Sequence, residues 1–252
     1  MSRLTVLLLV AVSTSLLFVT VRGTEAKDCP SNAALVGPIC VDKYEASVWE
    51  TTDLGVIKKI RDHTVTLADL TAAGAVQRGV AGNDYGSGCP PTGNGCVNFY
   101  AVSIPGVRPS AFVSWFQATA AARNSGKRLL TNAEWQAAAL GTPDGPPCVV
   151  VGAATQPTGT RGCVSDAGAF DMVGNVWEWV ADWVPLSAAD CPGWGSFSDD
   201  QMCFAGVETS GGPGALVRGG SIGYGDGAGV FAIRGDWGPT RGRLPVGFRA
   251  AH

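Results

Sequence analysis

The chain has 252 residues, of which 46% are hydrophobic and 15% are charged, and it contains 35 Gly and 15 Pro. This composition predicts a globular, loop-rich domain that is large enough to bury a core. The formal net charge is −3, with 18 basic and 21 acidic residues, so we expect no nucleic-acid partner.

The first 26 residues have the pattern of a secretory signal. One Arg precedes an uncharged, largely apolar run from Leu4 to Val21, and small and polar residues follow through Ala26. We therefore expect an exported protein, secreted or periplasmic, with no membrane attachment once residues 1–26 are removed. The alternative is an uncleaved anchor, because the apolar run approaches the length that spans a bilayer.

Three segments carry the start signal of a helix, a capping box formed by two residues three positions apart. These pairs are Thr66 with Asp69, which is the weakest, Ser114 with Gln117, and Thr131 with Glu134. Short strands are expected at residues 175–180, 229–237 and 246–251. Few short helices and many short strands between long loops indicate an α+β domain.

The eight Cys occur in four close pairs, each enclosing a short loop that contains Gly or Pro. An even number of Cys in an exported chain indicates disulfides. Sequence cannot choose the connectivity, but we favour pairing in chain order: Cys29 with Cys40, Cys89 with Cys96, Cys148 with Cys163, and Cys191 with Cys203.

Several stretches, taken in order, resemble the formylglycine-generating enzyme family, also called the sulfatase-modifying factor family. They are CVDKYEASVWE, FVSWFQATAAARNSGKRLLTNAEWQAAA, GAFDMVGNVWEWVADW, LVRGGS and VGFRAA. The resemblance implies a formylglycine-generating-enzyme-type variant of the C-type lectin fold, with few short helices, short antiparallel strands and long loops. We expect one domain over residues 27–252, with an insertion at about 62–108 that these motifs leave unexplained.

The resemblance also implies chemistry that this chain does not carry. Enzymes of the family bind copper with a pair of Cys between the RGGS and GFR motifs, and residues 221–246 contain no Cys. A related branch binds iron through three His, whereas this chain has only His63 and His252, the latter expected at a fraying end. We therefore expect neither copper nor iron, and the residues argue against catalysis.

Two other functions stay open. The first is a metal-dependent oxidase or other modifying enzyme of the family with an unrecognised site. A carboxylate pair could serve such a site, drawn from Asp166, Asp171, Glu178 and Asp182. The second is a structural component of an envelope.

The stretch FDMVGNVWEW carries the family's calcium-binding pattern. The resemblance implies structural calcium held by Asp171, Gly174, Val176 and Glu178. Calcium takes about six to eight hard oxygen ligands, and two carboxylates with main-chain carbonyls supply that chemistry. The alternative is that Glu178 forms an ion pair with an Arg in the core. We expect Arg218 and Arg249 to donate buried hydrogen bonds to backbone carbonyls.

Residues 219–249 alternate Gly with side chains of very different chemistry, a pattern unfavourable for a core. Tyr, Trp and Arg are enriched at binding hot spots, and Gly-rich loops display them on a scaffold. The segment also resembles the variable segment of diversity-generating-retroelement target proteins, which share the lectin-type fold. We therefore expect a protein or glycan ligand at Ile222, Tyr224, Asp226, Arg234, Asp236, Trp237, Arg241 and Arg243. The alternative is an irregular loop over the position of the missing copper site.

Overall fold

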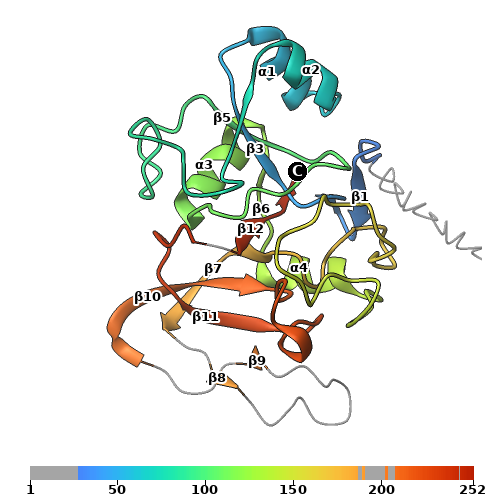
Figure 1. Ribbon diagram of the computed structural model, residues 1–252, viewed down its shortest axis with the longest axis vertical. Coiled ribbons are helices and arrows are strands. Elements are labelled where there is room, and N and C mark those ends of the chain that lie inside the picture. Colours follow the sequence, from blue (N-terminus) through green and yellow to red (C-terminus); the bar gives the residue numbers. More distant parts are fainter. Residues whose placement is uncertain (1–27, 187–188, 191–201, 204–207, 244) are drawn as a thin grey trace, which may run out of the picture.

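The structure, a computed structural model, describes residues 28–186, 189–190, 202–203, 208–243 and 245–252. Residues 1–26, the expected signal, lie outside these ranges. The fold is α+β, with short helices and short strands joined by long loops (Figure 1). Its helices are α1 (Leu54–Arg61), α2 (Leu67–Ala72), α3 (Trp115–Asn124) and α4 (Asn132–Ala139). No helix in the described ranges is long and apolar enough to cross a membrane.

All three predicted helix starts are confirmed, each by a reciprocal capping box between side chain and backbone. Helix α1 is not among the predicted helices. It begins after Asp53, whose side chain accepts a hydrogen bond from the Val56 amide at 2.8 Å. It buries Val56, Ile57 and Ile60 on one face, so packing stabilises a helix that is too short to form alone.

The strands of the described residues form four small sheets. One has the order β1 (Ala33–Val36), β2 (Ile39–Asp42), β13 (Ala250–Ala251) and β6 (Arg128–Leu129). The central sheet has the order β11 (Ile233–Trp237), β10 (Glu208–Arg218), β7 (Trp177–Leu186) and β12 (Val246–Phe248). The others join β4 (Val76–Arg78), β3 (Ser47–Glu50) and β5 (Phe99–Val102), and pair β8 (Ala189–Asp190) with β9 (Met202–Cys203).

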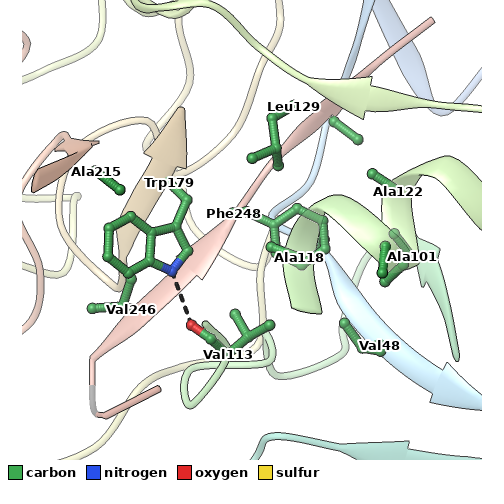
Figure 2. Packing of buried hydrophobic residues seen from close by; sticks show 14 of the residues in the cluster. Val48, Ala101, Val113, Ala118, Ala122, Leu129, Trp179, Ala215, Val246 and Phe248 are labelled. Carbon is green, nitrogen blue, oxygen red and sulfur yellow. Dashed lines mark hydrogen bonds between the residues drawn. The ribbon is translucent and has the colours of Figure 1, made fainter. Parts of the chain in front are cut away.

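Strand β7 separates two hydrophobic clusters, as its alternating sequence predicts. Trp177 and Trp179 lie in the cluster that also holds Phe248, whereas Val180 lies in the cluster around Trp135. Figure 2 shows Trp179 beside Phe248, with its indole N–H donating to the Val113 carbonyl at 2.9 Å. The two Trp are therefore core residues, and the indole N–H of Trp179 is hydrogen-bonded within the core.

The segment 246–251 differs from the single strand that its sequence predicts. Residues Val246–Phe248 pair in parallel with β7, and Ala250–Ala251 pair antiparallel with β2 and β6 in a different sheet. Arg249 lies at the break. The sequence-based expectation of antiparallel strands thus holds for the other named pairs but not for β7 with β12.

Three of the four expected disulfides are confirmed: Cys29–Cys40, Cys89–Cys96 and Cys148–Cys163. The fourth pair cannot be placed, because Cys191 lies outside the described residues; that link stays a prediction. Disulfides persist in oxidising compartments, so these three bonds indicate an extracytoplasmic protein.

Candidate ligand-binding site

A pocket of about 760 Å³ opens where the segment after β11 meets the loop between β4 and β5. These two segments lie on the same side of the molecule (Figure 1). One wall comes from residues 236–243, within the segment predicted to bind a ligand. The facing wall includes Asn83, Gly86, Pro90 and Pro91, which belong to the region that the sequence motifs left unexplained.

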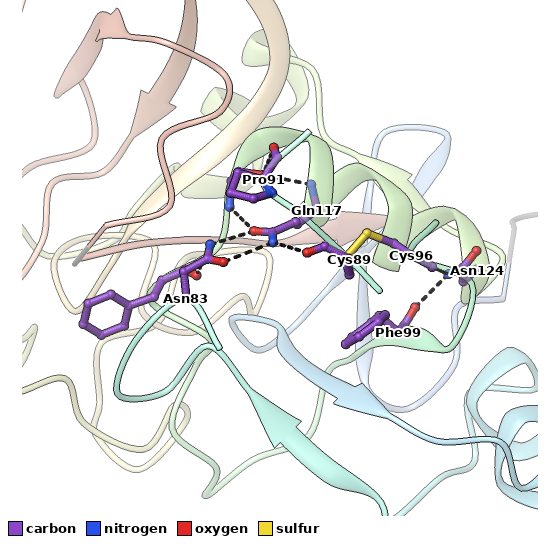
Figure 3. The surroundings of a disulfide bond; sticks show 9 residues. Asn83, Cys89, Pro91, Cys96, Phe99, Gln117 and Asn124 are labelled. Carbon is purple, nitrogen blue, oxygen red and sulfur yellow. Dashed lines mark hydrogen bonds between the residues drawn. A yellow bond between two sulfur atoms is a disulfide. The ribbon is translucent and has the colours of Figure 1, made fainter. Parts of the chain in front are cut away.

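The facing wall is held against α3 by a polar network around the buried side chain of Gln117 (Figure 3). The Gln117 amide donates to Cys89 O at 2.7 Å and exchanges hydrogen bonds with the Asn83 amide. At the other end of the loop, Asn124 Nδ2 donates to Phe99 O at 2.9 Å, and the Cys89–Cys96 disulfide closes the loop. Residues 83–96, which include the disulfide-closed loop and are called the Cys89–Cys96 loop below, form this wall. These hydrogen bonds and the disulfide hold it against α3 in the absence of a ligand.

On the other wall, two guanidinium groups lie over the Trp237 ring. The Cζ atoms of Arg234 and Arg241 are 4.5 and 4.4 Å from its centroid, within the range of cation–π attraction. Arg234 also forms an ion pair with Asp236 and donates to the Tyr224 hydroxyl at 3.2 Å. Burial, together with the charge of Arg234, lowers the pKa of Arg241.

The structure divides the predicted ligand-binding residues between two places. Asp236, Trp237, Arg241 and Arg243 line the pocket just described. Ile222 and Asp226 line a second pocket of about 470 Å³, beside Cys148. Tyr224 and Arg234 are in the lining of neither pocket; the Arg234 guanidinium donates a hydrogen bond to the Tyr224 hydroxyl.

The sequence pattern of residues 219–249 is unfavourable for a core, but Trp237 is buried in the core, and its contact with a ligand stays a prediction. Trp237 is only 4% exposed and packs edge to face with both Trp177 and Trp179, so its indole belongs to the core as well as to the pocket. In contrast, Arg241, Arg243 and Thr240 are exposed. The exposed side chains are therefore the ones that can be changed without disturbing the core.

Glu178, one of the expected calcium ligands, forms a buried ion pair with Arg249. Arg249 Nη2 lies 2.9 Å from Glu178 Oε1, and both side chains are 1% exposed or less. Trp135 Nε1 donates to the second carboxylate oxygen of Glu178 at 2.7 Å. Burial alone would lower the pKa of Arg249, but the charge and hydrogen bonds of Glu178 raise it. The alternative interpretation of Glu178, an ion pair with a core Arg, is confirmed.

Two further carboxylates lie near this pair. Asp171 accepts hydrogen bonds from the Thr158 hydroxyl at 2.8 Å and the Gly159 amide at 2.7 Å. Glu45 accepts one from the Val176 amide at 3.2 Å. Burial raises the pKa of both carboxyl groups, and the charges of Asp171 and Glu178 raise that of Glu45 further. Burial and the neighbouring charges therefore both disfavour the ionised form of Glu45.

The side chains of Asp171 and Glu178, as placed, do not fit a calcium ion. Glu178 already receives two donors, and a dication on its carboxylate would lie next to the Arg249 guanidinium, which would repel it. Asp171 is turned toward Thr158 and Gly159. Among the residues that the structure describes, no group of three or more His, Cys, Asp or Glu is arranged to hold a metal ion.

The other residues considered for catalysis lie apart. Asp182 accepts a hydrogen bond from the Asn132 amide at the start of α4, so it caps a helix instead of pairing with Glu178. His252 is not at a fraying end: its backbone pairs with Cys40, and its ring stacks on His63 with centroids 4.0 Å apart. Arg218 donates to the carbonyls of Val230 and Ala232, as the sequence predicts.

Comparison with known proteins identifies the family. Residues 58–147 and 149–252 match the family model of the sulfatase-modifying factor enzyme 1-like domain, and this match includes the whole region, about 62–108, that the motifs left unexplained. The chain belongs to this family.

Two curated relatives are formylglycine-generating enzymes. The one from Thermomonospora curvata is 37% identical over 101 residues, which are 30% of this chain and 33% of the relative. The one from Streptomyces coelicolor is 36% identical over 111 residues, which are 33% of this chain and 35% of the relative. The matches thus span about a third of each relative.

Among solved structures, the major tropism determinant U1 variant is similar, with a TM-score of 0.51 and 21% sequence identity. The similarity covers 90% of this chain and 53% of that one. It shows a shared fold, a formylglycine-generating-enzyme-type, C-type-lectin-like α+β domain.

We expect calcium not to change the melting temperature. Glu178 is already paired with Arg249, whose guanidinium would repel a cation bound to the same carboxylate. Thermal unfolding followed by circular dichroism, in about 1 mM calcium and then in chelator, tests this. A higher melting temperature in calcium, abolished by Glu178→Gln, would contradict it and support the calcium site that the sequence predicts.

Breaking the ion pair should be costly. Arg249→Met leaves the Glu178 charge buried without a partner, so we expect it to lower the free energy of unfolding by about 3 to 5 kcal/mol. Adding Glu178→Gln to Arg249→Met should cost less than the two single losses together. Urea denaturation measures all three variants, with the exposed Arg123→Met as the control. Additive losses would show that the two side chains are not coupled.

Proposed function

We propose that the protein is exported, to the periplasm or outside the cell, and binds a protein ligand without catalysing a reaction. The binding site is the pocket between the Cys89–Cys96 loop and residues 236–243. The observation that carries the proposal is this pocket, which presents exposed arginines from a wall anchored in the core by Trp237.

Both walls favour binding because they are rigid. The Gln117 network and the disulfide fix one wall, and Trp237 fixes the other. Binding to a preorganised surface loses less conformational entropy, so more of the interaction energy appears as affinity. Arg and Trp are also among the residues that dominate binding energy at protein interfaces.

The comparisons support a binding role in part. The similar solved structure is named as a determinant of tropism, and this chain shares its fold. The curated relatives are named as enzymes, but residues 221–246, where their family carries the copper-binding Cys pair, contain no Cys here. A scaffold that keeps the fold and lacks those ligands is consistent with binding alone.

The pocket can be blocked without touching the core. Thr240 is exposed and lines the pocket, so Thr240→Trp should place an indole in it. Peptides selected from a displayed random library on the immobilised protein should bind this variant at least about tenfold more weakly than the wild type. Leu54→Trp, which adds an indole at an exposed position on α1, should bind them like the wild type.

Three outcomes would contradict the proposal. Equal binding of the selected peptides by the wild type and by Thr240→Trp would place binding elsewhere. Oxygen consumption with a thiol peptide that depends on added copper or iron would support the enzymatic alternative. Retention on isolated envelopes that is independent of Thr240 would support a structural role.

A further inference from the structure

The pocket has an excess of positive charge. Asp236 is the acidic residue in its lining, and Arg234 already pairs with it, with Nη2 at 2.8 Å from Oδ2. Arg241 and Arg243 line the same pocket and are exposed. Neither forms an ion pair with any residue that the structure describes. Within the part of the chain that the structure describes, two positive charges of the pocket lining are therefore without an ion-pair partner.

The geometry of Arg241 leaves it ready to bind an anion. Its guanidinium carbon lies 4.4 Å from the Trp237 ring centroid, within the range of cation–π attraction. The N–H donors of a guanidinium lie along its edge, in a fork that matches the two oxygens of a carboxylate. The contact with Trp237 thus limits the motion of the side chain before a ligand binds.

The remaining lining indicates what else the ligand carries. Pro90 and Pro91 contribute apolar rings, and the volume of about 760 Å³ is far larger than one anionic group needs. An acidic peptide can place a carboxylate on Arg241 and a neighbouring side chain against the Pro rings. A sulfated glycan could satisfy the arginines but brings little apolar surface to the opposite wall.

We propose that the pocket binds an acidic segment of a protein ligand, with Arg241 and Arg243 each engaging a carboxylate. This inference rests on the proposed function and specifies its ligand class. Arg241 forms the two-pronged contact, since Trp237 holds it in place. Arg243 provides the second charge. Oppositely charged surfaces also speed the encounter between partners, so binding should weaken as salt is raised.

The test uses a fluorescein-labelled hexaglutamate peptide and a matched hexaglutamine peptide. Wild-type protein should bind hexaglutamate at least about tenfold more tightly than hexaglutamine, and the double variant Arg241→Gln, Arg243→Gln should lose that preference. The control is Arg108→Gln with Arg123→Gln, which removes the same charge from two exposed positions outside the pocket. It should bind within about twofold of the wild type. Melting curves of both variants verify that they are folded.

Each contrary outcome has a separate meaning. If the wild type shows no preference for hexaglutamate, or if both double variants lose it equally, the inference is overturned. If a heparin-derived sulfated oligosaccharide binds more tightly than hexaglutamate and depends on the same two arginines, the ligand is a glycan and the acidic-peptide assignment is wrong. If library peptides depend on Thr240 but contain no acidic residues, the proposed function stands and only the charge assignment fails.

Discussion

Arg249 is the residue on which the arrangement of the domain depends. Its side chain donates to the Asp42 carbonyl at the end of β2, to the Phe170 carbonyl and to the Glu178 carboxylate on β7. Its backbone lies between β12 and β13, which belong to two different sheets. A fully buried charge is tolerated only when it is paired and hydrogen-bonded, so all of these groups must be in place together.

The central sheet connects the buried ion pair to the pocket. Glu178 and its neighbours Trp177 and Trp179 fix strand β7, and β10 and β11 are added along one edge of it. Trp237, at the end of β11, packs against both of these Trp residues. The stacked arginines are therefore attached to the core through a single aromatic residue. Trp237 therefore contacts both the core Trp residues and the arginines of the pocket.

Short-range sequence patterns predicted much of the fold. Capping boxes three residues apart located α2, α3 and α4, and alternation located the two faces of β7. The RGGS motif is also explained locally: Gly219 has a positive φ, and a Cβ there would lie 2.5 Å from the Met172 carbonyl oxygen. Family resemblance supplied the topology that such patterns do not contain.

The misses involve partners that are distant in sequence. Nothing near Glu178 identifies Arg249 as its partner, because the two residues are 71 positions apart in the chain. The calcium site that the family resemblance implies stays a prediction, to be tested by the melting temperature. Trp237 was expected to be displayed because its neighbours are Gly and charged residues, but Trp177 and Trp179 bury it. The facing wall of the pocket comes from residues 83–91, which carry no binding signal of their own.

The central claim is that two segments distant in sequence form one binding site on a rigid frame. Hydrogen exchange measured by mass spectrometry, with and without a library-selected peptide, tests it most directly. The account predicts slower exchange in both 83–91 and 236–243 when the peptide is bound, with residues 33–50 unchanged. Protection confined to 144–152 and 222–226, around the second pocket, would contradict it.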